Sequence, residues 1–185
     1  MPISRAEENV IAITNKWLER AVIGLNLCPF AKAVHVKKQI RYLVSGAATP
    51  DALCVTLAEE LKFLIAAEAE TIDTTLIIHP YTLTDFLTYN DFLDDANRAL
   101  VELKLDGEIQ IASFHPHYQF ADTAPDDITN FTNRSPYPML HLLRESSIDK
   151  AVAAFPNAAM IYEKNIATMQ TLGSAGWEAL FLSDA

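Results

Sequence analysis

Three short runs of β-branched and apolar residues, separated by stretches with helical spacing, constrain the fold of this chain most strongly. The runs are IRYLV at 40–44, TTLII at 74–78 and EIQIASF at 108–114. Val, Ile and Thr are favoured in strands because their branched side chains suit a pleated, partly buried surface. We therefore predict three β-strands at these positions.

Apolar residues recur with helical spacing before, between and after these runs. Ser4 and Glu7 have the spacing of a capping box, which predicts a first helix over about 4–25. Thr49-Pro50 and Thr84-Asp85 are typical helix starts. The further helices that we predict span about 49–70, 84–103, 138–145, 148–155 and 157–172, with Gly173 as the stop of the last.

The order of these elements predicts the fold class. A helical connection between consecutive strands makes them parallel, with a right-handed crossover. We predict an α/β fold, in a single domain over residues 1–185, with a short, about three-stranded, mostly parallel sheet flanked by helices. Ligands of open parallel sheets bind beyond the carboxyl ends of the strands. Here those ends are Ser45-Gly46, His79-Pro80 and His115-Pro116-His117.

Charge and composition narrow the classes of partner. The net charge is −10, with 24 acidic against 14 basic residues. Such a charge repels phosphate backbones, so we expect no nucleic-acid partner. No apolar stretch approaches the ~20 residues of a membrane helix, and no targeting segment is evident. We expect a soluble, cytoplasmic protein whose two cysteines, Cys28 and Cys54, are free thiols.

The segment 113–145 has the strongest signs of a functional site. It runs for about twenty residues without helical or strand periodicity, and long irregular segments in compact domains are functional or disordered. Its aromatic residues and prolines argue against disorder, because unfolded segments are poor in groups that can be buried. We expect an ordered loop lined by polar side chains.

His115 and His117 are two residues apart, so they point the same way if the strand continues through Pro116. His79, at the end of the neighbouring strand, can complete a three-nitrogen set for zinc, iron or manganese. General acid/base catalysis without a metal is an equally supported alternative. A structural role, in which the rings only bond to the backbone, is the third.

Arg134 precedes a predicted helix, and a guanidinium beside a helix N-terminus can bind a carboxylate or phosphate. An ion pair with Asp126, Asp127 or Glu145 is the structural alternative. The polar side chains around it that we predict to contact a substrate are Asn130, Asn133, Ser135 and His141. His141 can also hydrogen-bond Glu145 one helical turn away, or simply face solvent.

Cys28 lies where the first predicted helix ends, and a thiol there does not gain the lowered pKa of a helix N-terminus. A buried small apolar residue is the default interpretation, with a functional thiol or metal ligand as alternatives. The chain has five glycines and no nucleotide-binding, P-loop or serine-hydrolase motif, so we expect no nucleotide cofactor.

Three motifs carry a family resemblance: Cys28-Pro29-Phe30-Ala31, Phe114-His115-Pro116, and Asn133 to Pro138 leading into His141 to Glu145. On these the chain resembles the bacterial and plant family catalogued as domain of unknown function 1415. The resemblance carries over no activity. It does imply that Cys28 belongs to the site, which restores a Cys/His metal site or a thiol redox step as alternatives.

These observations lead to one main functional hypothesis. We expect a small enzyme acting on an anionic molecule, in which His115 and His117 are acid/base groups or metal ligands and Arg134 binds the anion. Hydrolysis is the reaction that we predict. The alternatives are a non-catalytic module that binds a metal or metabolite, a thiol or metal redox protein that uses Cys28, and a structural protein.

Overall fold

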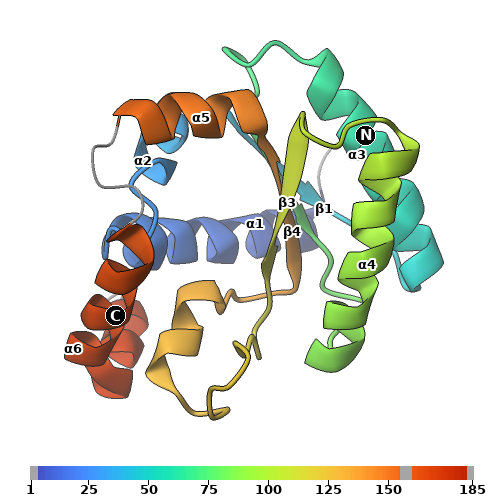
Figure 1. The fold of residues 1–185 in the computed structure, drawn as a ribbon. Coiled ribbons are helices and arrows are strands. Elements are labelled where there is room, and N and C mark those ends of the chain that lie inside the picture. The colour runs from blue at the N-terminus through green and yellow to red at the C-terminus, as the bar shows by residue number, and fades with distance from the viewer. Residues whose placement is uncertain (1–3, 155–159, 183–185) are drawn as a thin grey trace.

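The computed structural model describes residues 4–154 and 160–182 and contains one four-stranded sheet between two layers of helices (Figure 1). The elements are α1 (Arg5–Trp17), η1 (Leu18–Ile23), α2 (Ala31–Val36), β1 (Ile40–Val44), α3 (Pro50–Ala66), β2 (Thr74–Ile78), α4 (Phe86–Glu102), β3 (Ile109–Phe114), η2 (Ile128–Asn133), β4 (Met139–Arg144), α5 (Glu145–Ala154) and α6 (Ile161–Leu182). The mixed α/β class that the sequence predicts is confirmed.

The sheet differs from the predicted one in strand number and direction. Its order is β1-β2-β4-β3. β1 and β2 are parallel, whereas β4 is antiparallel to both β2 and β3. The prediction of about three, mostly parallel strands was therefore wrong in detail. β1, β2 and β3 nevertheless run in one direction, because β3 is antiparallel to a strand that is itself antiparallel to β2.

β4 is the element that the sequence pattern misassigned, since we predicted a helix over 138–145. The strand lies in the middle of the sheet, and Met139, Leu140 and Leu142 are fully buried on its two faces. A central strand covered on both sides is a continuous apolar run without alternation, which periodicity alone does not distinguish from a buried helix.

Each face of the sheet has its own apolar core. Leu53, Leu57 and Leu61 of α3 and Tyr89 and Phe92 of α4 pack on one face. The other face is covered by α1 and η1, and the last turns of α6 add to that core. Figure 1 shows α3 and α4 on one side of the strands and α5 and α6 on the other.

The helix starts follow the sequence signals closely. Ser4 and Glu7 form the predicted capping box, Thr49 caps α3, and Asp85 caps α4. The short helix α2, after the Cys28-Pro29 turn, was not predicted. Gly173, the predicted helix stop, has φ 64° and ψ 175° and divides α6 into two helical parts.

The predicted boundary between the helices over 148–155 and 157–172 falls at residues 155–159, outside the described residues. Among the residues that are described, no helix is long and apolar enough to cross a membrane.

Candidate functional site

The carboxyl ends of β1, β2 and β3 lie at one edge of the sheet, although an antiparallel strand separates two of them. The N–H of His79, just after β2, donates to the carbonyl of Pro138, just before β4, over 3.0 Å. Met139 pairs with Ile78 on one side and with Phe114 on the other. His79 and His115, which follow those two partners, are therefore brought to the same edge.

The rings of His79 and His115 both lie against the ring of Tyr89, and all three side chains are fully buried. The Tyr89 ring centroid is 5.8 Å from that of His79 and 5.0 Å from that of His115. The Tyr89 hydroxyl donates to the carbonyl of Met139 and accepts the N–H of Phe114. Tyr89 thus joins α4 to the end of β3 and the start of β4.

His79 is held as the neutral Nδ1–H tautomer. Its Nδ1 lies 3.1 Å from the carbonyl oxygen of Thr82, which can only accept, so the proton is on Nδ1. Its Nε2 is buried without a hydrogen-bond partner among the described residues. Burial, with a smaller contribution from His115 nearby, lowers the pKa of His79 to about 4.

Both ring nitrogens of His115 form hydrogen bonds with backbone groups. Its Nε2 lies 3.1 Å from the carbonyl oxygen of Leu83, and its Nδ1 accepts the N–H of His117 over 3.0 Å. Burial lowers its pKa. A neutral ring with two occupied nitrogens has no lone pair left for a substrate proton or a metal. The geometry therefore gives His115 a positioning role within the site.

Leu83 shows how tightly this loop is held. It is buried and has a φ of 56°, in the left-handed region that a leucine rarely adopts. Two consecutive carbonyls of the loop, those of Thr82 and Leu83, bond to His79 and His115. The two histidines thus fix the connection from β2 to α4.

His117 is the exposed imidazole of this edge. Its backbone N–H is anchored on His115, and its ring centroid lies 5.9 Å from that of His115. No hydrogen bond engages its ring nitrogens within the described parts of the chain. Of the three histidines predicted here, His117 is the one that solvent and a ligand can reach.

Arg134 is half-buried and anchored by carbonyls. Its Nε donates to the carbonyl of Tyr118 at 3.1 Å and its Nη2 to that of Pro125 at 2.5 Å. Its Cζ lies 4.3 Å above the centre of the Phe131 ring. The predicted alternative, an ion pair with an acidic neighbour, is absent: across residues 4–154 and 160–182, no carboxylate lies within 4 Å of this guanidinium.

The side chains predicted to contact a substrate bond to the protein instead. Asn130 is fully buried, accepts from Phe120 N–H and the Thr123 hydroxyl, and donates to the carbonyl of Ala124. Asn133 donates to the carbonyl of Ser113, and Ser135 to that of Tyr137. These residues order the loop, so the expectation of an ordered loop is met.

His141 lies on β4, away from the edge, and does not pair with Glu145. Its Nε2 is 2.6 Å from the Thr74 hydroxyl, which donates its own proton to the carbonyl of Leu142. His141 therefore carries its proton on Nε2. Burial lowers its pKa to about 4.

Cys28 lies between η1 and α2, half-buried against the core on the α1 face of the sheet. Burial raises the pKa of its thiol, and hydrogen bonds from the backbone N–H groups of Phe30 and Ala31 only partly oppose this. The expectation that the thiol gains no lowered pKa therefore holds, although a short helix that we did not predict begins just after it.

The predicted metal ligands are not gathered into one set. In the described portion of the chain, no group of three or more His, Cys, Asp or Glu side chains is arranged to hold a metal ion. His115 would have to give up a backbone hydrogen bond before it could coordinate one.

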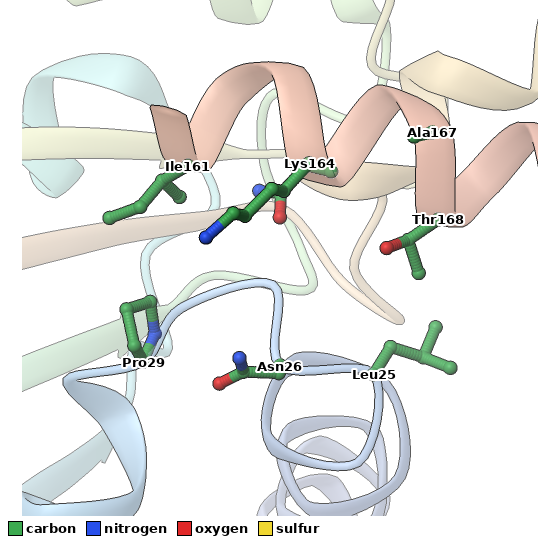
Figure 2. A pocket seen from close by; sticks show the side chains of 8 residues that line it. Leu25, Asn26, Pro29, Ile161, Lys164, Ala167 and Thr168 are labelled. Atoms are coloured by element: carbon green, nitrogen blue, oxygen red, sulfur yellow. The ribbon is translucent and has the colours of Figure 1, made fainter. Parts of the chain in front are cut away.

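A cleft of about 310 Å³ lies elsewhere, between the first half of α6 and the turn that joins η1 to α2 (Figure 2). Its lining residues are Leu25, Asn26, Pro29, Ile161, Lys164, Asn165, Ala167 and Thr168. Sequence reasoning missed it because the two walls are more than 130 residues apart. The Cys28-Pro29 motif was the one signal that pointed to this region.

Comparison with known proteins places the chain in a family without an assigned activity. The family model that matches residues 9–179 is described as Protein of unknown function (DUF1415). This confirms the resemblance that the sequence motifs carried. No curated protein and no solved structure matches the chain.

Proposed function

Because the chain belongs to the DUF1415 family, whose description names no reaction, we propose a function from the geometry of the sheet edge. The protein binds a small anionic molecule through Arg134 and acts on it by acid/base chemistry at His117. The observation that carries this proposal is the half-buried guanidinium of Arg134, which no carboxylate of the described residues neutralises.

Arg144, which is buried, also bonds to carbonyl oxygens and has no carboxylate partner among the described residues, but Arg134 is partly exposed, where a ligand can reach it. The chain carries 24 acidic residues, yet carbonyl oxygens and an aromatic ring surround Arg134. Partly buried charges are normally paired, because removal from water costs free energy that a counterion restores. A bound carboxylate or phosphate supplies that counterion.

The anchoring of Arg134 also leaves donors for a ligand. A guanidinium has five N–H donors, and the carbonyls of Tyr118 and Pro125 accept from Nε and Nη2 alone. The stacking on Phe131 fixes the plane of the group. A planar donor held in one orientation favours two-point binding of a carboxylate or phosphate.

His117 is the acid/base group that we propose. It directly precedes Tyr118, whose carbonyl accepts from Arg134 Nε, so the backbone of His117 is close to the guanidinium. An imidazole nitrogen can accept a proton as a general base and return it as a general acid. In the hydrolysis that we propose, His117 takes a proton from a water whose oxygen bonds to the acyl carbon or phosphorus of the ligand. The bond from that atom to the leaving oxygen or nitrogen breaks, and His117 gives the proton to the leaving atom.

The test combines turnover and binding in matched variants. A panel of small carboxylate and phosphate esters is assayed with wild-type protein, His117→Gln, Arg134→Gln and Arg98→Gln. Arg98 is an exposed arginine on α4 that serves as the control for loss of one positive charge. For the substrate that is turned over, we expect His117→Gln to lower kcat about 100-fold or more, the usual contribution of a general base.

Arg134→Gln should mainly raise KM, whereas Arg98→Gln should change neither constant. Turnover that is equal in wild type and His117→Gln would refute the catalytic role. A KM for the panel substrate that is the same in wild type and Arg134→Gln would refute the whole proposal.

A non-catalytic anion-binding module is the second candidate. One observation favours it: His115 and Arg134 are both bonded to the backbone, so a single exposed imidazole remains for chemistry. Binding that depends on Arg134, with no turnover of any panel substrate, would decide for this candidate.

A further inference from the structure

We propose that the cleft between α6 and the turn at residues 24–30 binds a short-chain aliphatic carboxylate. This site is separate from the sheet edge and does not depend on the function proposed there. The combination of polar and apolar groups on the two walls points to this ligand class (Figure 2).

The cleft is preformed by one hydrogen bond between its walls and one within the turn. Asn165 on α6 donates from Nδ2 to the carbonyl of Leu27 over 2.9 Å, which ties the helix to the turn. The turn is closed by the N–H of Leu27, which donates to the carbonyl of Val22 at 2.9 Å. Asn26 has a φ of 55°, a left-handed conformation that asparagine tolerates better than most residues. A cavity with fixed walls binds a ligand without an ordering penalty.

Three hydrogen-bonding side chains face the space between the walls. Figure 2 shows Lys164 and Thr168 extending from α6 and the amide of Asn26 rising from the turn below them. An ammonium has three N–H donors, so Lys164 can bind an anion while it also serves another acceptor. An amine, an amide and a hydroxyl from two walls suit the two oxygens of a carboxylate.

The rest of the lining is apolar and limits the size of the ligand. Leu25, Pro29 and Ile161 are partly exposed and line the cleft beside the polar groups. They can cover the hydrocarbon part of a ligand, whereas inorganic phosphate has none. A volume of about 310 Å³ is at the lower end of small-molecule sites, which favours a chain of a few carbons.

The cleft and the Arg134 site contact different parts of α6. The cleft residues of α6 end at Thr168, whereas Phe131, beneath Arg134, contacts Trp177 after the break at Gly173. The two sites can therefore be separated by mutation.

The experiment is a series of titrations followed by amide NMR of the full-length protein. Acetate, butyrate, hexanoate and inorganic phosphate are added separately to the wild type. We expect saturable shifts at Asn26, Lys164 and Thr168, with binding up to about fourfold tighter for each added methylene. Inorganic phosphate should bind more weakly than hexanoate.

Matched variants locate the site. Lys164→Gln should weaken hexanoate binding about fivefold, and Leu25→Ser should remove the dependence on chain length. Lys150→Gln, which removes an exposed lysine on α5, should change neither, and Arg134→Gln should also leave hexanoate binding unchanged.

Three results would overturn the proposal: no saturable shift at the cleft residues, affinity independent of chain length, or identical affinities in wild type and Lys164→Gln. If Arg134→Gln abolished hexanoate binding, hexanoate would bind at the sheet edge and not in the cleft.

Discussion

At the scale of single residues, the histidines of the sheet edge divide into a buried pair and an exposed one. His79 and His115 bond to consecutive carbonyls of the loop after β2, whereas His117 faces solvent. The sequence indicated that these residues lie at strand ends. It did not distinguish an acid/base group from a positioning group, because the partners of His115 include Leu83, thirty-two residues earlier, in a conformation that its own sequence does not favour.

The burial of His115 predicts a stability effect. His115→Ala leaves the Leu83 carbonyl and the His117 N–H without their partner and opens a cavity. We expect a loss of about 2–4 kcal/mol in the free energy of unfolding, measured by urea denaturation. His117→Ala, the exposed neighbour, should change it by less than about 0.5 kcal/mol. Equal stabilities of the two variants would show that the bonds of His115 do not hold the edge together.

A second prediction at this scale concerns Asn130, whose side chain makes three hydrogen bonds inside the loop. Asn130→Ala removes all three at a fully buried position. We expect a loss of about 2–3 kcal/mol in unfolding free energy and faster cleavage by chymotrypsin after Tyr118 or Phe120. Asn97→Ala, on the exposed face of α4, is the control and should be neutral or slightly stabilising. An unchanged cleavage rate in Asn130→Ala would contradict the ordering role.

At the scale of elements, the sequence correctly predicted those features that depend on interactions between residues close together in the chain. The helix starts at Ser4, Thr49 and Asp85 were found because a cap bonds within its own turn. β4 was missed because its strand character comes from β2 and β3, which pair with it from distant parts of the chain. α2 was missed because six residues are too few for a periodic stripe.

Gly173 gives a prediction for α6. Its φ of 64° and ψ of 175° are accessible almost only to glycine, so a side chain there strains the backbone. Gly173→Ala should lower the unfolding free energy by about 1–3 kcal/mol, as measured by urea denaturation. Gly46→Ala is the matched control, because an added methyl group there meets nothing within 4 Å and φ is not positive. A Gly173→Ala protein as stable as the Gly46→Ala protein would contradict the break seen in α6.

At the scale of the whole molecule, both apolar cores contain neutral histidines. His79 lies on the α3 and α4 face, and His141 on the opposite face. Burial lowers the pKa of each to about 4. In the unfolded chain both should titrate near the ordinary value of about 6.5. The unfolded state therefore binds protons between these pH values that the folded state does not.

The sign of the resulting pH dependence follows from this difference. The contribution of these histidines to stability is fully present above pH 6.5 and is lost as the pH falls towards 4. For His79 the loss amounts to roughly 3 kcal/mol. Urea denaturation at pH 7.0, 6.0, 5.0 and 4.5 should show a steady decline, and His141→Gln should reduce the slope. A stability that is constant between pH 7.0 and 4.5 would contradict the neutral burial of both rings.

The central claim is that the guanidinium of Arg134, which no carboxylate of the described residues neutralises, binds a small anion. The most direct measurement is NMR of the arginine side-chain N–H groups during titration with malonate and with inorganic phosphate. We predict a saturable shift of the Arg134 Nε and Nη signals with at least one of them, while those of Arg98 stay in place. Arg134 signals that do not move at anion concentrations of about 50 mM, well above a millimolar dissociation constant, would contradict the claim.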